Sequence, residues 1–300
     1  MGKLLFKALA ILCAFTILVI PLDTVGYYAD ETATEEIRDI CKKTYELYKN
    51  SPDTIRILSY NVLSDRIGYN GSPCENRQDG ITEVITRLSP DILCLQEVCR
   101  GWFTIIKNNT DYEAVNPLKT ELAGLMTAIF YDNNKVELTE WGDETYVSGG
   151  DYRIRRAVWG LFRIIETGKT VCVVNTHFSI TKDTDTYSGG QAMELIKITD
   201  TLKVKYSCPI FIAGDFNARK RTTVTYPSSS IYEILSSSYI DTALSAELFS
   251  SGNKNFSPTS TVDHIFLIGE AEIKRYIVLS NKVFLHISDH YPIFVDVRLE

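Results

Sequence analysis

The sequence has no excess of basic residues. Its 300 residues include 31 Lys and Arg against 38 Asp and Glu, which gives a formal net charge of -7. Proteins that coat nucleic acid by charge alone rely on clustered Lys and Arg, so the acidic balance argues against that class. It leaves room for an enzyme that acts on phosphates through a bound cation.

Low-complexity tracts and Pro-, Gly- or Ser-rich linkers are also missing from the sequence. Because 45% of the residues are apolar and only 23% are charged, the composition indicates a globular chain rather than a disordered one. The seven cysteines and four histidines do not cluster at the spacing of zinc ligands. We therefore predict a folded chain without a zinc site.

The amino terminus differs in kind from the rest of the chain. Lys3 and Lys7 precede a short apolar segment, residues 8–20, which is followed by Pro21 and a polar, acidic stretch. A basic flank with a short apolar core is typical of a secretory signal peptide, and the segment is short for a bilayer span. We expect a signal peptide over residues 1–26 and a secreted protein, with a retained signal anchor as the alternative.

Export would determine whether the cysteines can form disulfides. Loss of Cys13 leaves the other six, an even number that permits disulfides in an exported protein. Cys94 and Cys172 lie in apolar, strand-like runs, where buried free thiols are an equally good interpretation. The sequence does not define the pairing.

Beyond the amino terminus, strand and helix patterns alternate. Apolar residues at helical spacing predict an amphipathic helix between residues 30 and 50, within an N-terminal extension over residues 27–53. Strands and helices then interleave without a linker, so we predict one α/β domain over residues 54–300. Strands are expected at residues 55–60, 92–95, 126–131, 157–165, 171–175, 210–213, 262–268 and 293–297, and helices at 81–88, 191–205 and 231–236.

Acids, amides and imidazoles stand at the ends of six of these strands. Gly214, for example, ends an apolar run and is followed by Asp215 and Asn217, whose side chains point the same way in an extended segment. Each such residue alone has a structural explanation as a turn former, a cap or a buried histidine. Together they favour one site assembled across a sheet. The candidates are Asn61, Glu97, Asn175, His177, Asp215, Asn217, Asp263, Asp289 and His290.

These residue types suit metal-assisted chemistry at phosphorus. Mg²⁺ takes oxygen ligands and keeps several waters, so it needs only one or two side chains such as Glu97 and Asn61. Attack on phosphorus requires a deprotonated water, for which His290 beside a carboxylate is a reasonable base. Asn217 and His177 are donors that can hold the phosphate and stabilise its growing charge.

The order of these motifs resembles that of the endonuclease/exonuclease/phosphatase superfamily, which includes deoxyribonuclease I-like and sphingomyelinase-like enzymes. The resemblance covers about residues 54–299 and rests on Asn61, Gln96-Glu97, Asn175-Thr176-His177, Gly214 to Asn217, Asp263, and Ser288 to Pro292. It implies a four-layered α/β sandwich with two packed β-sheets flanked by helices. It also implies cleavage of phosphate esters that depends on Mg²⁺, for which Mn²⁺ can substitute.

The resemblance further implies a role for each residue. Glu97 is expected to be the main metal ligand, with Asn61 beside it and Asp289 as a further ligand. Asp263 is expected to orient His290.

On the substrate side, the resemblance implies that Asp215 positions or deprotonates the water and that Asn217 binds the phosphate. His177 is expected to contact the phosphate or to assist the leaving group. Arg155 and Asn175 are expected to bind substrate. Many relatives place a Glu directly before the strand that begins here at Met126, but this chain has Leu125 there; Glu121 is the alternative partner for His177.

These expectations define a secreted, monomeric, Mg²⁺-dependent phosphodiesterase, nuclease-like, without a stable protein partner. A sphingomyelinase-like phospholipid hydrolase is the alternative within the fold. A catalytically inactive binding module is the alternative outside enzymes. His264 and His286 have no special neighbours in the sequence, and packing or surface roles are expected for both.

Overall fold

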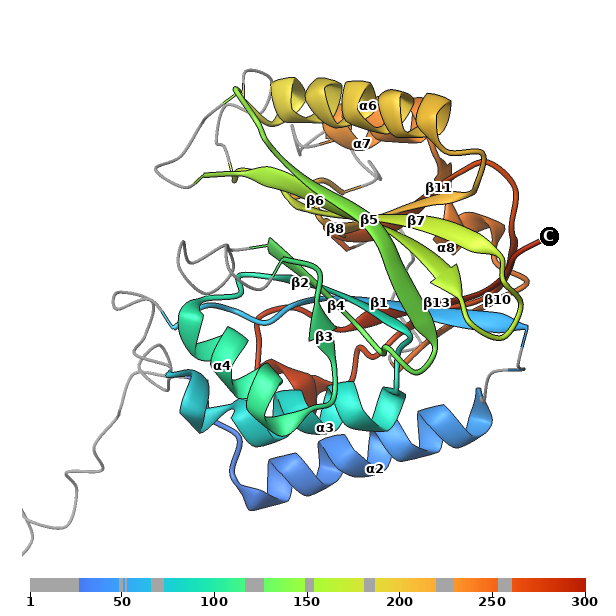
Figure 1. Cartoon of the computed structure of the whole chain (residues 1–300). Helices are drawn as coiled ribbons and strands as arrows, with labels where there is room; N and C mark the ends of the chain where they lie inside the picture. Colours follow the sequence, from blue (N-terminus) through green and yellow to red (C-terminus); the bar gives the residue numbers. More distant parts are fainter. Residues whose placement is uncertain are drawn as a thin grey trace, which may run out of the picture.

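Two mixed β-sheets face each other at the centre of the molecule, and helices cover the outer side of each (Figure 1). The computed structural model describes residues 27–48, 51, 53–65, 73–116, 127–148, 154–180, 187–219, 229–252 and 261–300. Within these ranges the first sheet has seven strands in the order β10-β12-β13-β1-β2-β4-β3. They are β1 (Thr54–Asn61), β2 (Ile92–Gln96), β3 (Glu113–Ala114), β4 (Thr127–Tyr131), β10 (Leu248–Ser251), β12 (Glu272–Val278) and β13 (Ile293–Arg298).

The second sheet has six strands within the described ranges, in the order β5-β6-β7-β8-β11-β9. They are β5 (Val136–Thr145), β6 (Arg156–Ile164), β7 (Thr170–His177), β8 (Ile210–Asp215), β9 (Ile240–Asp241) and β11 (Asp263–Ile268).

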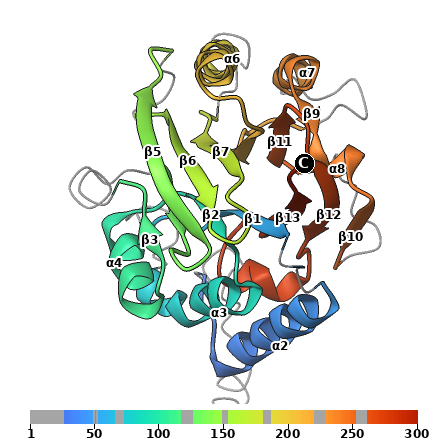
Figure 2. The same cartoon turned by 45° about the vertical axis from the view of Figure 1, so that its right-hand side comes forward.

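Helices form the two outer layers, as the second view shows clearly (Figure 2). Beside the first sheet lie α2 (Glu31–Leu47), α3 (Gln78–Leu88), α4 (Arg100–Asn109) and the 3₁₀ helices η2 (Cys74–Asn76) and η3 (Lys282–His286). Beside the second sheet lie α6 (Ser188–Lys205) and α7 (Ser229–Ser238), and the short α8 (Thr242–Ser245) follows β9.

Alternating strand residues produce this layering. Leu58 of β1 faces the helices, where it joins a cluster that includes Ile37 of α2, whereas its neighbour Ile57 faces the other sheet. In the second sheet, Phe211 packs between the sheets, and Ile212 packs under α6 and α7. Three apolar clusters therefore separate four layers, and the predicted four-layered α/β sandwich is confirmed.

The expected strands and helices are present, with ends that differ by a few residues. Three longer elements were not expected: β5, β12 and α4. Strand β5 lies at a sheet edge and consists mostly of polar residues, of which several are exposed, so it lacks the apolar alternation that identifies a strand. Residues 1–26, the expected signal peptide, lie outside the described residues. Among the residues that are described, no helix is long and apolar enough to cross a bilayer.

Candidate active site at the strand ends

Strand register brings the candidate residues to one end of the two sheets. In the first sheet, β1 and β2 are parallel and Asn61 lies opposite Gln96, so Asn61 and Glu97 emerge at the same edge. In the second sheet, β7 and β8 are parallel with His177 opposite Asp215. Strand β11 runs antiparallel to β8 and places Asp263 opposite the same Asp215.

Asp215 is the centre of the resulting cluster. Its Oδ2 atom accepts a hydrogen bond of 3.0 Å from Asn61 Nδ2, which joins the two sheets. The same oxygen lies 3.3 Å from His177 Nε2 and 3.5 Å from His290 Nε2. Three side chains from separate segments thus converge on one buried carboxylate, which is 1% exposed.

His290 is held by Asp263. Its Nδ1 atom lies 2.8 Å from Asp263 Oδ2, and its Nε2 atom faces Asp215. The backbone of His290 is fixed as well, because its N–H donates to Ser288 Oγ (3.2 Å), and that hydroxyl donates to the carbonyl of Asn61 (2.6 Å). A carboxylate at Nδ1 favours the tautomer in which Nε2 carries the lone pair, the arrangement that a general base requires.

The charges of this cluster shift the pKa values of its members. Burial raises the pKa of Asp215 to about 6, and the negative charge of Asp263 adds to this effect, while the charge of His290 opposes it. Burial alone would lower the pKa of His290, but the carboxylates of Asp263 and Asp215 outweigh it and raise that pKa well above its ordinary value. His290 is therefore a stronger base than a free histidine.

The expected metal ligands are oxygen donors whose positions are set by local hydrogen bonds. Glu97 Oε2 accepts a 2.9 Å hydrogen bond from Ser64 N–H, and Asn61 Oδ1 accepts one of 3.0 Å from Leu63 N–H, so both oxygens have fixed positions. Partial burial raises the pKa of Asp289, the positive charge of His290 opposes this effect, and the nearby charge of Glu97 adds to it. Mutual repulsion of carboxylates is relieved by a hard cation, so this donor set fits a divalent ion.

Three members of the cluster around Asp215 are also possible metal ligands. The ligand atoms of Asp215, Asp263 and His290 all lie within 4.8 Å of one another, close enough to hold a metal ion together.

Backbone geometry explains why the apolar run of β8 ends in Gly214. A Cβ atom at this position would lie 2.1 Å from the carbonyl oxygen of Thr176 on β7, so only glycine lets the strands approach this closely. Asn217 then adopts a left-handed conformation with φ of 50°, its N–H donates to Asp215 Oδ1 (2.9 Å), and its Nδ2 donates to Phe178 O (2.9 Å). Glu97, with φ of 61°, is left-handed too. Such conformations are uncommon outside glycine and cluster at functional sites.

Asn175 does not fit the expected contact with substrate. Its side chain is fully buried, its Nδ2 donates to the carbonyls of Leu95 and Ala128, and its Oδ1 accepts from Gln96 Nε2. The amide is therefore used to join the two sheets behind the cluster.

The other expectations concern residues outside the cluster. Arg155 is buried directly before β6, and its carbonyl accepts from Tyr146 N–H; its contact with substrate stays a prediction. His264 is fully buried, and its Nε2 lies 2.8 Å from Ala218 O, so it has the packing role that was expected. His286 is exposed, as expected for a surface role. Glu121 lies outside the described residues.

Sequence reasoning missed Arg77, which is fully buried beneath the site. Its Nη1 donates to the carbonyls of Val62 and Ile287 (2.8 Å each), and its Nη2 donates to Leu63 O (2.7 Å). The guanidinium lies 4.9 Å from the ring centre of Trp102. Arg77 thus joins the segment that follows Asn61 to the segment that precedes Asp289. Because its acceptors are backbone carbonyls remote in sequence, no residue pattern could have revealed it.

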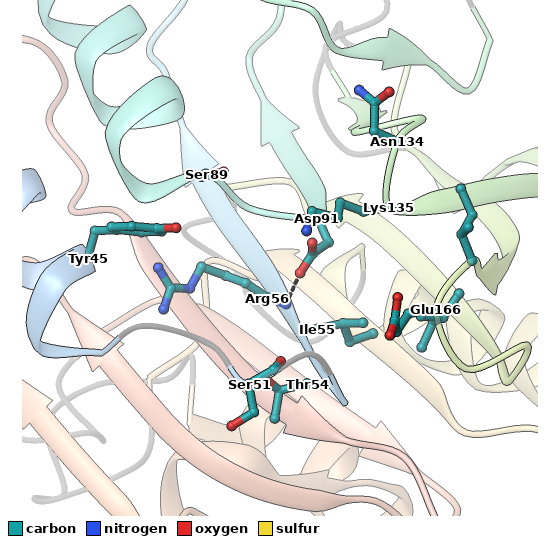
Figure 3. A pocket seen from close by; sticks show the side chains of 12 residues that line it. Tyr45, Ser51, Thr54, Ile55, Arg56, Ser89, Asp91, Asn134, Lys135 and Glu166 are labelled. Atoms are coloured by element: carbon teal, nitrogen blue, oxygen red, sulfur yellow. Dashed lines mark hydrogen bonds between the residues drawn. The ribbon is translucent and has the colours of Figure 1, made fainter.

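A separate pocket of about 420 Å³ lies at the other end of β1 (Figure 3). It is lined by the first residues of β1, by Asp91 and by Lys135. Its arginine, Arg56, already donates to Asp296 and to Leu88 O. None of the candidate site residues lines this pocket, so it is remote from the cluster around Asp215.

Comparison with known proteins places the chain in a family. The sequence model of the Endonuclease/Exonuclease/phosphatase family matches residues 58–290. The chain belongs to this family. The match begins within β1 and ends at His290, so it contains the whole cluster.

Curated relatives include nocturnin from Xenopus laevis, 23% identical over an alignment of 246 positions that covers 75% of this chain and 61% of that protein. Human nocturnin is 22% identical over 72% of this chain and 54% of its own length. The chain therefore spans little more than half the length of the curated relatives it matches.

Solved structures with the same fold include an endonuclease/exonuclease/phosphatase from Bacteroides vulgatus, with a TM-score of 0.67, 19% identity, and coverage of 82% of this chain and 99% of that one. The mannosyl-6-phosphatase of Bacteroides thetaiotaomicron has a TM-score of 0.64, 23% identity, and coverage of 81% and 99%. TDP2 from D. rerio, in complex with a single-strand DNA product, has a TM-score of 0.60, 17% identity, and coverage of 81% and 98%. At these identities the likeness shows the fold alone.

Proposed function

We propose that this phosphoester hydrolase depends on Mg²⁺, or on Mn²⁺, and cleaves phosphodiester bonds in a nuclease-like reaction. The observation that carries the proposal is the convergence of Asn61, His177 and the Asp263-His290 pair on Asp215 from both sheets. Acid, base and amide groups at such distances suit proton transfer and phosphate binding far better than packing.

Glu97, Asn61 and Asp289 would hold the metal ion, which supplies positive charge to the phosphate oxygens. His290 takes the proton of the attacking water at Nε2, while Asp263 holds its Nδ1–H and stabilises the imidazolium. Asp215 lies 3.5 Å from that nitrogen and positions the water. Asn217 and His177 donate to the phosphate as its charge grows.

A phosphomonoester of a small sugar is the second candidate substrate. The net charge of -7 disfavours tight binding of a long polyanion, and one solved structure of the same fold is a mannosyl-6-phosphatase. A single phosphate on a neutral sugar meets less repulsion from an acidic protein than a nucleic acid does.

A substrate panel tests the proposal. Purified protein with Mg²⁺ is assayed against bis-p-nitrophenyl phosphate, single- and double-stranded DNA, RNA, sphingomyelin, p-nitrophenyl phosphate and mannose 6-phosphate. The nuclease-like proposal predicts hydrolysis of diesters, nucleic acid among them, at higher kcat/KM than monoesters. The reverse order supports the sugar-phosphate candidate, cleavage of sphingomyelin alone supports the lipid alternative, and no hydrolysis supports the binding module.

The Asp263-His290 pair predicts a shift in the pH profile of Asp263→Asn. The base must be neutral, and the carboxylate of Asp263 helps to raise the pKa of His290 against the lowering effect of burial. Removing that charge lowers this pKa, so the acid limb of kcat/KM should move to lower pH. The maximal rate should fall roughly 10²- to 10⁴-fold because an asparagine amide favours the wrong tautomer. Profiles of both proteins on one substrate check this; an acid limb that stays in place or moves to higher pH would contradict it.

We also propose that the chain is exported. The basic flank, the short apolar segment of residues 8–20 and the even number of remaining cysteines support this proposal. N-terminal sequencing of the protein from its native host should find a first residue between about positions 22 and 32. Recovery of a chain that begins at Met1 in a membrane fraction would favour the signal anchor instead.

A further inference from the structure

Two cysteine thiols touch beside the expected metal ligands. Cys74 Sγ in η2 lies 3.4 Å from Cys99 Sγ, and Cys99 is the residue directly before α4. Cys99 follows Glu97 by two positions, and Cys74 precedes Arg77 by three. The contact therefore joins the turn that carries Glu97 to the segment that carries Arg77.

The backbone on both sides of the contact is fixed. Arg77 N–H donates to the carbonyl of Cys74 (3.0 Å), and Phe103 N–H donates to the carbonyl of Cys99 (3.0 Å). Gly101, in the first turn of α4, lies directly against the thiol: a Cβ atom there would be in van der Waals contact with Cys74 Sγ at 3.4 Å. The sulfurs lie 3.4 Å apart, so they need to approach by only about 1.4 Å to reach the length of a disulfide bond.

We propose that Cys74 and Cys99 form a disulfide in the mature protein. The two thiols lose two protons and two electrons to a disulfide oxidant such as oxidised glutathione, whose own S–S bond breaks to give two thiols. The new bond holds η2 against α4. Arg77 is thereby fixed on the carbonyls of Val62, Leu63 and Ile287, which flank Asn61 and Asp289.

A bound metal ion is the competing use of the same atoms. Asp65, Cys74 and Cys99 have ligand atoms within 4.8 Å of one another. A structural zinc site needs four ligands, however, and these residues provide three. The export that the amino terminus predicts exposes the thiols to an oxidising compartment, where paired cysteines become disulfides. The proposal does not depend on which reaction the protein catalyses, because neither measurement below uses activity.

Peptide mapping tests the bond directly. The folded mature chain is equilibrated with oxidised glutathione, free thiols are alkylated, and a non-reduced tryptic digest is analysed by mass spectrometry. We expect residues 67–77 linked to residues 88–100. Since the second peptide contains both Cys94 and Cys99, the digest is repeated on Cys99→Ser, in which the link should disappear. Alkylated Cys74 and Cys99 in the oxidised wild type, or a link that persists in Cys99→Ser, would overturn the proposal.

Thermal melts give a second readout. Reductant should lower the melting temperature of the oxidised wild type by roughly 4–10 °C, the range for a loop of about 25 residues in a domain of this size. The Cys74→Ser/Cys99→Ser variant should show no such shift, whereas Cys208→Ser, a control in the loop between α6 and β8, should respond like wild type. An equal shift in the double variant, or one zinc ion per chain in the purified wild type, would overturn the proposal.

Discussion

Replacement of His290 by Ala should lower the turnover number at least about a hundredfold, the usual loss when a general base is removed. His290 Nε2 faces the carboxylate of Asp215 at 3.5 Å, and Asp263 holds the opposite ring nitrogen at 2.8 Å, so no other described imidazole is placed in the same way. The measurement is kcat on the best substrate of the panel, at the pH optimum of the wild type.

The matched control for His290 is His286. It is also a histidine, lies four positions earlier in the same segment and is exposed. His286→Ala should retain wild-type turnover, whereas His264→Ala is a poor control because its ring is fully buried among aromatic side chains. Melting temperatures of both variants separate lost chemistry from lost folding. A folded His290→Ala that turns over near the wild-type rate would show that the base lies elsewhere.

Replacement of Glu97 by Gln should weaken metal binding while the fold survives. The glutamine oxygen can still accept the hydrogen bond from Ser64 N–H, but the negative charge that faces the cation is lost. We expect the affinity for Mn²⁺, measured by calorimetry, to fall at least about 10- to 100-fold, because even losing a partner that supports a ligand has effects of this size. Turnover at low Mg²⁺ should fall with it.

Glu113→Gln provides the control for Glu97. Glu113 lies in β3 of the same sheet, is exposed, and pairs only with Lys107 at the surface among the described contacts. The change should leave both metal affinity and turnover as they are in the wild type. If Glu97→Gln binds Mn²⁺ with wild-type affinity, Glu97 is not a metal ligand. The ion would then be assigned to Asp215, Asp263 and His290, whose ligand atoms lie within 4.8 Å of one another.

The sequence predicted those parts of the fold that depend on local patterns. Strand β8 is an apolar run ended by glycine, and α3 repeats its apolar residues at helical spacing, so both were found. Strand β5 was missed because an edge strand with exposed polar residues has no apolar signature. The site residues His177, Asp215 and His290 were found because they stand at the ends of strands. There, a polar residue next to an apolar run is visible in the sequence.

Residues that act through distant backbone could not be predicted. The family resemblance implied a substrate contact for Asn175, but its side chain bonds to two carbonyls and the Gln96 side chain of the opposite sheet. No sequence pattern identifies Arg77, since the guanidinium donates to backbone carbonyls that lie 14 to 210 positions away. The proximity of Cys74 and Cys99 likewise required the packing of η2 on α4, which no spacing rule supplies.

The central claim is that the strand ends around Asp215 form a metal-dependent site for phosphate ester hydrolysis. The most direct measurement is the initial rate of wild-type hydrolysis of its best panel substrate, first with EDTA and then during titration with Mg²⁺. The account predicts no hydrolysis in the chelator and a saturable return of activity with Mg²⁺ or Mn²⁺, because neutral donors and histidines alone leave the phosphate charge unbalanced. Full activity in the presence of EDTA would contradict it.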